Sequence, residues 1–114
     1  MKDTLVFLRH IQDAIGNIEA DTGKGKKGFF ANRTVQDAVL YNLQIIGEAA
    51  GKVSKKVKEA YTDVPWREII DLRNVIAHEY FGISMEVIWN ILEKDLPPLK
   101  KQITHIIDHL DSHA

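Results

Sequence analysis

Apolar residues recur every three or four positions along most of the chain, the spacing that gathers them on one face of an α-helix. The pattern predicts five helices, at residues 4–20, 34–57, 66–81 and 84–95 and in a last segment after Pro98. No segment alternates apolar and polar residues for the length of a strand, and there is no Asn-Gly hairpin signal. The sequence therefore predicts an all-α fold, an antiparallel up-and-down bundle of four to five helices forming a single domain over residues 1–114.

Glycine and proline mark the connections between these helices. The Gly- and Lys-rich segment 21–28 is expected to be a loop that ends the first helix. Pro97 and Pro98 predict a break before the last helix, because proline lacks a backbone donor and clashes with the preceding turn. Pro65 suits the first position of the third helix, where Asp63 would accept from the first-turn amides.

The third helix carries a charged side chain on its apolar face. At 100° per residue, Arg73 falls in the middle of a face made by Trp66, Ile69, Ile70, Ile76, Ala77 and Tyr80. A guanidinium there is costly unless it is paired and hydrogen-bonded. Three explanations stay open: the arginine lifts its head to water, it forms a structural ion pair, or it faces a cleft where a phosphate binds to its planar fork.

His78 follows five positions after Arg73, so the two side chains point about 140° apart on an ideal helix. They share a ligand only if the helix ends or bends near Ala77, or if a second subunit supplies half of the site. An end is indicated by Gly82, which suits a left-handed cap, and by Ser84, which suits the start of the next helix. A lone histidine in a last turn is otherwise typical of a solvated or capping imidazole.

The octet Arg73-Asn74-Val75-Ile76-Ala77-His78-Glu79-Tyr80 resembles a known signature. It matches the R-x4-H-x-Y pattern of HepT-type toxins, which belong to the HEPN superfamily of small helical nucleases. The resemblance extends from about Leu5 to about Ile107. It is carried by the segments TVQDAVLYNLQIIGEAAGKVS, VPWREIIDLRNVIAHEYFGI and IWNILEKDLPPLKKQI.

This resemblance implies a HEPN-like bundle that forms a homodimer, with the site where two protomers meet. It implies the toxin of a HepT/MntA-type toxin–antitoxin system, an endoribonuclease that acts on RNA without a metal or other cofactor. Arg73 and His78 would be the catalytic residues, and Asn74 would support them by hydrogen bonds. The partner would be a nucleotidyltransferase antitoxin that neutralises the toxin by adding AMP to Tyr80.

Two other functions remain open from the residues. In the first, the chain would be a non-catalytic module that binds a nucleotide or docks a nucleotidyltransferase, with Arg73 on the phosphate. In the second, it would be a helical dimer in which Arg73 closes an interface salt bridge. Without the resemblance, Tyr80 is typical of a residue that packs on the apolar face with its hydroxyl satisfied.

The composition of the chain indicates the kind of protein and its compartment, but not the reaction that it catalyses. Apolar residues make up 45% of the chain and charged residues 27%, which is typical of a folded globular domain. There is no cysteine, and no apolar run approaches the roughly 20 residues of a membrane span. We therefore expect a cytoplasmic protein. The net charge of −1 requires that any contact with phosphate come from local basic patches.

Weaker features lie outside the octet. Basic clusters would either follow a phosphate backbone or be solvated: Lys24, Lys26 and Lys27 in the loop, and Lys52, Lys55, Lys56 and Lys58 late in the second helix. His105, His109 and His113 have the spacing of a Zn²⁺ or Ni²⁺ site, although a solvent-facing row is favoured.

The second predicted helix bears more than one apolar or small face, which indicates a central or interface helix. Asn42 lies on its main apolar stripe, and Gly47 lies on another face. Glu48 is a candidate partner for Arg73 or His78.

Overall fold

The computed structural model describes residues 2–112, which form seven α-helices, one 3-10 helix and no strand. The α-helices are α1 (Lys2–Asp21), α2 (Gly25–Ala31), α3 (Arg33–Lys52), α4 (Lys55–Ala60), α5 (Trp66–His78), α6 (Met85–Lys94) and α7 (Leu96–Ser112). The 3-10 helix η1 (Tyr80–Gly82) lies between α5 and α6. The predicted all-α class is confirmed.

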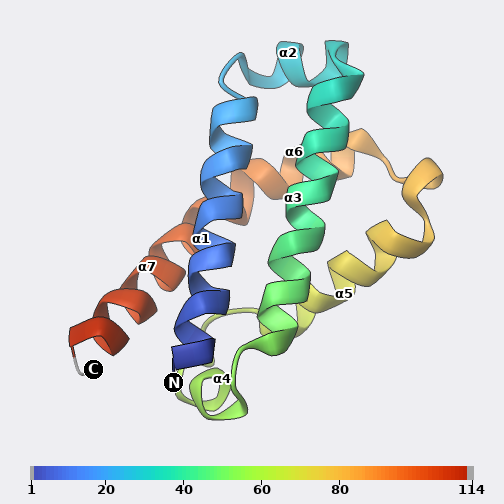
Figure 1. Ribbon diagram of the computed structural model, residues 1–114. Coiled ribbons are helices and arrows are strands. Elements are labelled where there is room, and N and C mark those ends of the chain that lie inside the picture. Colours follow the sequence, from blue (N-terminus) through green and yellow to red (C-terminus); the bar gives the residue numbers. More distant parts are fainter. Residues whose placement is uncertain (1, 113–114) are drawn as a thin grey trace.

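Four long helices build the domain. Helices α1 and α3 run side by side in opposite directions, and α2 joins them at one end (Figure 1). Helix α7 packs on α1, and α5 packs on α3, so the order across the molecule is α7, α1, α3, α5. Helix α6 packs against α7 and returns the chain from α5.

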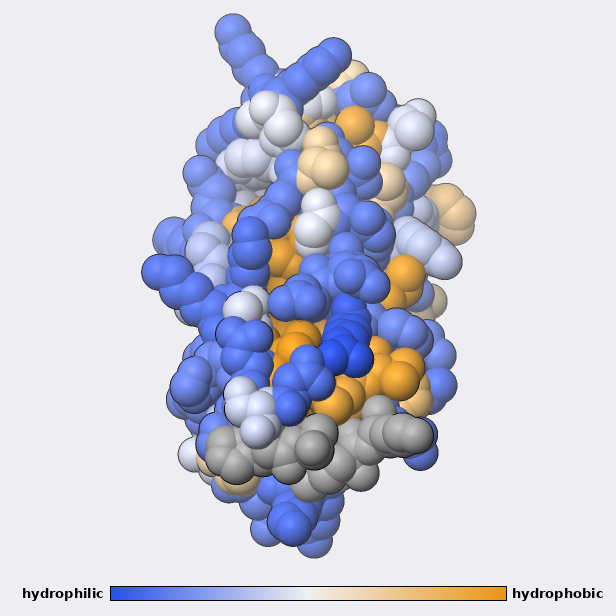
Figure 2. Space-filling model, turned by 60° about the vertical axis from the view of Figure 1, so that its left-hand side comes forward, coloured by the Kyte–Doolittle hydropathy of each residue, from blue (hydrophilic) through white to orange (hydrophobic). Residues whose placement is uncertain are grey.

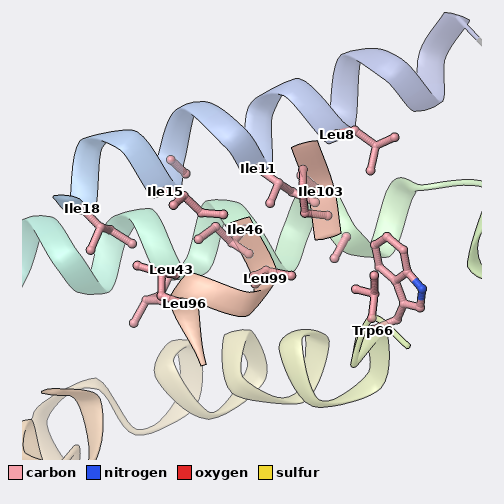
Figure 3. Close-up of a cluster of buried hydrophobic side chains, with 14 of the residues drawn as sticks. Leu8, Ile11, Ile15, Ile18, Leu43, Ile46, Trp66, Leu96, Leu99 and Ile103 are labelled. Atoms are coloured by element: carbon pink, nitrogen blue, oxygen red, sulfur yellow. The ribbon is translucent and has the colours of Figure 1, made fainter. Parts of the chain in front are cut away.

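The core lies between α1, α3 and α7, where apolar residues at helical spacing face one another (Figure 3). Ile11 on α1 and Ile103 on α7 have no exposed surface, and Ile46 on α3 is 2% exposed. Burying one such side chain contributes about 1.5–3 kcal/mol. The apolar stripes read from the sequence are therefore the core faces of these helices.

The predicted helix 34–57 is two helices. Helix α3 ends at Lys52, and α4 starts after Ser54, whose side-chain oxygen accepts from the Val57 amide at 3.2 Å. The Ser54 amide donates to Thr4 Oγ1 at 3.1 Å, which ties the break to α1. A serine that caps the following turn competes with continuation of the preceding helix, and periodicity alone did not reveal this.

The segment 21–28 is only partly a loop, because α2 begins at Gly25. Gly25 has a φ of +77°, a conformation that glycine adopts at little cost. Asn32 then caps α3 by accepting from the Val35 amide at 3.2 Å. The expectation of an irregular connection through residue 28 was therefore wrong.

A break separates the last two helices, as predicted, but it falls at Asp95, and α7 begins at Leu96 and not after Pro98. Pro97 and Pro98 lie in the first turn of α7, where a missing N–H removes no helical hydrogen bond. Ser84 caps α6 by accepting from the Val87 amide at 3.3 Å, which confirms the predicted start of that helix.

The face of the domain drawn in Figure 2 is largely hydrophilic. Hydrophobic residues appear only in small patches on the face drawn in Figure 2. Within residues 2–112, no helix has both the length and the apolar character needed to cross a bilayer.

Candidate active site

Helix α5 is anchored at its start by Trp66. The indole is 8% exposed, and its Nε1 donates to the Tyr61 carbonyl at 3.0 Å. Pro65 is the N-cap residue and not the first helical residue, and no side chain caps the helix. The predicted cap by Asp63 was wrong, because that residue instead offers its backbone carbonyl to Gln102 Nε2 at 3.1 Å.

Helix α5 ends at His78, which confirms its predicted place in the last turn. The Glu79 amide still donates to the Val75 carbonyl, and the chain then tightens into η1, where the Gly82 amide donates to the Glu79 carbonyl at 2.9 Å. Gly82 does not have a positive φ, so the predicted left-handed cap was wrong. A 3-10 turn satisfies the same carbonyls without that conformation.

Arg73 lies where α5 comes closest to α3. A Cβ atom built on Gly47 would be 2.2 Å from Arg73 Cβ and 3.0 Å from the Ile69 carbonyl oxygen. No side chain larger than hydrogen fits at residue 47 with this helix spacing. Gly47 therefore determines how deeply the base of Arg73 is set against α3, a role that the sequence did not reveal.

Arg73 is half-buried as a residue, and its guanidinium has one exposed hydrogen bond, from Nη1 to Asn74 Oδ1 at 3.3 Å. None of the ion pairs among residues 2–112 includes Arg73. The structural ion pair considered from the sequence is thus not formed within one protomer. Most of the donors of the fork are left for an anion.

Asn74 is exposed and accepts from the arginine, so it orients the guanidinium. His78 is exposed as well, and α5 is helical without interruption from Trp66 to His78. There is no break at Ala77 that would turn the imidazole toward Arg73. One chain therefore presents the two groups on different sides of α5, about 140° apart.

Tyr80 is fixed by a contact with α3. Its hydroxyl donates to Asp37 Oδ1 at 2.9 Å. Burial, the hydrogen bond to Asp37 and the charge of that carboxylate raise the pKa of Tyr80, and Arg33 opposes the shift. Asp37 lies 43 positions before Tyr80, so only the packing of η1 on α3 identifies it as a functional candidate.

Glu48 does not reach Arg73 or His78. It is exposed, and its carboxylate lies 4.0 Å from the Lys52 ammonium, one turn later on α3. The suggested supporting role of Glu48 was therefore wrong.

Among the described residues, the lysine clusters and the histidines of the last helix show no sign of a binding site. Lys24, Lys26 and Lys27 are exposed at the start of α2, and Lys58 donates to the Gly51 carbonyl at 3.3 Å. In the part of the chain that the structure describes, no three His, Asp or Glu side chains are grouped so as to hold a metal ion.

The histidine row of the last helix includes two described residues. His105 and His109 both lie edge-on to Tyr61, with ring centroids at 6.3 and 6.4 Å. His113 lies outside the described residues.

Two large side chains are exposed on the elements that carry Tyr80 and its partner Asp37. Phe81 is 93% exposed on η1, and Tyr41 is 64% exposed on α3. Trp89 is half-buried against Phe29, with ring centroids 5.2 Å apart. Asn42 is buried, with its amide donating to the Ala38 carbonyl and its oxygen accepting from Asn17.

The arrangement is that of a small helical domain in which α5 carries Arg73, with no ion pair among residues 2–112, and ends at the exposed His78. Tyr80 follows on η1 and is hydrogen-bonded to α3. The family model described as "Ribonuclease HepT-like" matches residues 11–106. The chain therefore belongs to the HepT-like ribonuclease family.

Three relatives show how widely this domain occurs. The "Probable ribonuclease HepT" of Thermococcus cleftensis is 35% identical over 82% of this chain and 86% of its own length. A "Putative RNase" of Caldanaerobacter subterraneus subsp. tengcongensis is 35% identical over 94% of this chain and 96% of its own length.

The third relative is the "Gamma-glutamylcyclotransferase and putative RNase" of Methanocaldococcus jannaschii, which is 35% identical over 98% of this chain. Our chain spans about half of that protein, 51% of its length. No solved structure gave a significant match.

Proposed function

We propose that the protein is a metal-independent endoribonuclease that acts as the toxin of a HepT/MntA-type toxin–antitoxin system. Membership in a ribonuclease family supports the reaction class. The observation that carries the assignment of residues is the state of Arg73. Its Cβ packs against Gly47, its guanidinium donates to Asn74, and it has no carboxylate partner among residues 2–112.

The chemistry follows from the two side chains. Arg73 binds the scissile phosphate through its fork and stabilises the negative charge that develops on the phosphoryl oxygens. His78 takes the proton from the ribose 2′-hydroxyl or gives a proton to the departing 5′-oxygen, since imidazole exchanges protons readily near neutral pH. The 2′-oxygen bonds to phosphorus as the bond to the 5′-oxygen breaks, so the products carry a 2′,3′-cyclic phosphate and a free 5′-hydroxyl.

A homodimer resolves the separation of the two groups. In a twofold assembly the same surface is buried on both protomers, so Arg73 of one chain can face His78 of the other. Exposed Tyr41 and Phe81 supply apolar surface for such an interface. Each dimer would then contain two such sites, each with Arg73 from one protomer and His78 from the other.

Mixing two inactive variants tests this site. Arg73→Ala and His78→Ala should each abolish RNA cleavage while leaving the helical CD signal unchanged. Random mixing makes half of the dimers heterodimers, each with one intact composite site. The mixture should therefore recover about a quarter of the wild-type rate. A mixture that stays inactive, although native mass spectrometry detects heterodimers, would contradict a site shared between protomers.

If His78→Ala cleaved RNA at the wild-type rate, His78 would have no part in the mechanism. If both single variants bind RNA or a nucleotide normally and wild type shows no turnover, the chain is a binding module.

Tyr80 is the proposed site of neutralisation. A nucleotidyltransferase partner would transfer AMP from ATP to the Tyr80 hydroxyl, releasing pyrophosphate and the phenolic proton. The added phosphate would place bulk and negative charge on the residue two positions after His78 and compete with RNA for Arg73. Intact-mass analysis of the chain after incubation with the partner and ATP should show AMP increments that Tyr80→Phe lacks. Equal increments on both proteins would place the modification elsewhere.

A further inference from the structure

An apolar groove runs beside α5, separate from the candidate active site. It has a volume of about 400 Å³, and none of Arg73, Asn74, His78 and Tyr80 lines it. Helix α5 forms one wall, α3 forms the floor, and the end of α6 with the start of α7 forms the other wall. The chain leaves along α5, turns through η1 and comes back along α6 (Figure 1). The residues that line the groove come from both of these arms.

The floor and walls of the groove are hydrophobic and incompletely covered. Val75 is 45% exposed, and Ile69, Leu72 and Ile91 are half-buried. The remaining apolar lining residues are Leu43, Ile46, Pro65, Leu96 and Leu99. Concave apolar surface of this size on a folded domain is typical of a binding site for another molecule.

The charged residues of the groove all have the same sign. Glu68, Asp71 and Asp95 line it, and no lysine, arginine or histidine does, although the chain has nearly equal numbers of basic and acidic residues. All three carboxylates are exposed, and none belongs to an ion pair among residues 2–112. Unpaired carboxylates around an apolar floor repel RNA phosphates and favour a cationic partner.

We propose that this groove docks an amphipathic helix of another protein, with apolar side chains on one face and lysine or arginine residues beside them. The apolar residues would fill the space over Leu72 and Val75, as a helix laid in a groove does with residues spaced by three and four. The basic residues would pair with Glu68, Asp71 and Asp95 at the rim. This inference does not depend on RNA cleavage or on Tyr80.

Two labelled synthetic peptides serve as probes. Each has about 14 residues with leucine at helical spacing, and the other positions are lysine in one peptide and glutamate in its counterpart. Fluorescence anisotropy should detect binding of the lysine peptide to the wild-type protein, weakened by added salt, and no binding of the glutamate peptide.

Charge reversal locates the binding. The groove variant carries Glu68→Lys, Asp71→Lys and Asp95→Lys. The matched control carries Asp13→Lys, Glu59→Lys and Glu93→Lys, which change the net charge equally at exposed positions outside the groove. The groove variant should bind the lysine peptide at least about tenfold more weakly, whereas the control should stay within about twofold of wild type. The groove variant should also gain binding of the glutamate peptide.

Val75→Ser tests the apolar part at a position exposed enough to leave the fold intact, and it should also weaken binding. Equal effects of the two triple variants, or an unchanged affinity in Val75→Ser, would overturn the proposal. If the groove variant alters self-association without peptide, measured by sedimentation velocity, the occupant is a second copy of this chain and the assignment to another protein is wrong. Loss of RNA binding in the groove variant alone would assign the surface to substrate, with the same consequence.

Discussion

Gly47→Ala is the substitution that most directly tests how the site is built. The new Cβ would lie 2.2 Å from Arg73 Cβ, whereas carbon atoms in contact are ordinarily about 3.5–4.0 Å apart. The helices α3 and α5 would have to separate locally by about 1.3 Å or more to relieve the overlap. The 3.0 Å approach to the Ile69 carbonyl prevents relief by a side-chain rotation, because that atom belongs to the backbone of α5.

The stability change combines two opposing effects. Overpacking of this kind costs about 1–3 kcal/mol, and replacing a helical glycine by alanine contributes about 1 kcal/mol of stability. The net loss should therefore be about 0–2 kcal/mol, or a fall in Tm of up to about 8 °C for a domain of this size. The rate of RNA cleavage should fall by more than the small loss of stability would suggest, because a displacement of about 1 Å at a catalytic group can reduce the rate about 100-fold.

Gly51→Ala is the matched control on the same helix, since apart from its chain neighbours and the nearby backbone of α3 itself no atom lies within 4 Å of the position of its Cβ. It should raise the Tm slightly and leave RNA cleavage unchanged. Thermal unfolding and the kcat/KM for a single-stranded RNA should be measured on both variants. If Gly47→Ala equals Gly51→Ala in both measurements, the close approach of α3 and α5 does not position Arg73.

Two further predictions concern single hydrogen bonds. The pKa of Tyr80 is raised in the folded state, so folding favours the neutral phenol. The contribution of Tyr80 to the free energy of unfolding is complete below the ordinary pKa of tyrosine. It is lost as the pH rises from that pKa through the raised pKa of the folded protein. Urea unfolding between about pH 7 and pH 11 should show this loss in wild type and a smaller one in Tyr80→Phe; equal pH profiles would contradict it. Ser54→Ala should lower the free energy of unfolding by about 1 kcal/mol, because the Val57 amide loses its acceptor, and an unchanged urea midpoint would argue against the cap.

Much of the fold could be predicted from periodicity, because the apolar stripe of a helix is also the face that it buries. Ile11, Ile46 and Ile103 recur at helical spacing with the other apolar residues of their segments, and they lie in the core. Ser84 was recognisable as a cap, since a capping side chain acts on its own helix three residues later. These features depend on local sequence, so the sequence was sufficient to identify them.

The features that were missed depend on segments far apart in the chain. The contact of Tyr80 with Asp37 and the fit of Arg73 against Gly47 exist only because η1 and α5 pack on α3. Gly82 was predicted to be a left-handed cap because glycine can adopt that conformation, but it can equally adopt a negative φ, as it does here. The separation of Arg73 from His78 was correctly read from helical geometry, and how two protomers arrange these groups stays a prediction.

The hydroxyl of Tyr80 has one hydrogen, and in the free protein that hydrogen holds η1 to Asp37. Any group esterified to this oxygen removes the hydrogen and leaves a carboxylate facing the adduct. A group attached to Tyr80 would therefore also release η1 from α3, so the amides of residues 79–82 should exchange with deuterium faster in the modified protein. Deuterium exchange of these backbone amides would then report whether Tyr80 is modified, without any assay of RNA cleavage.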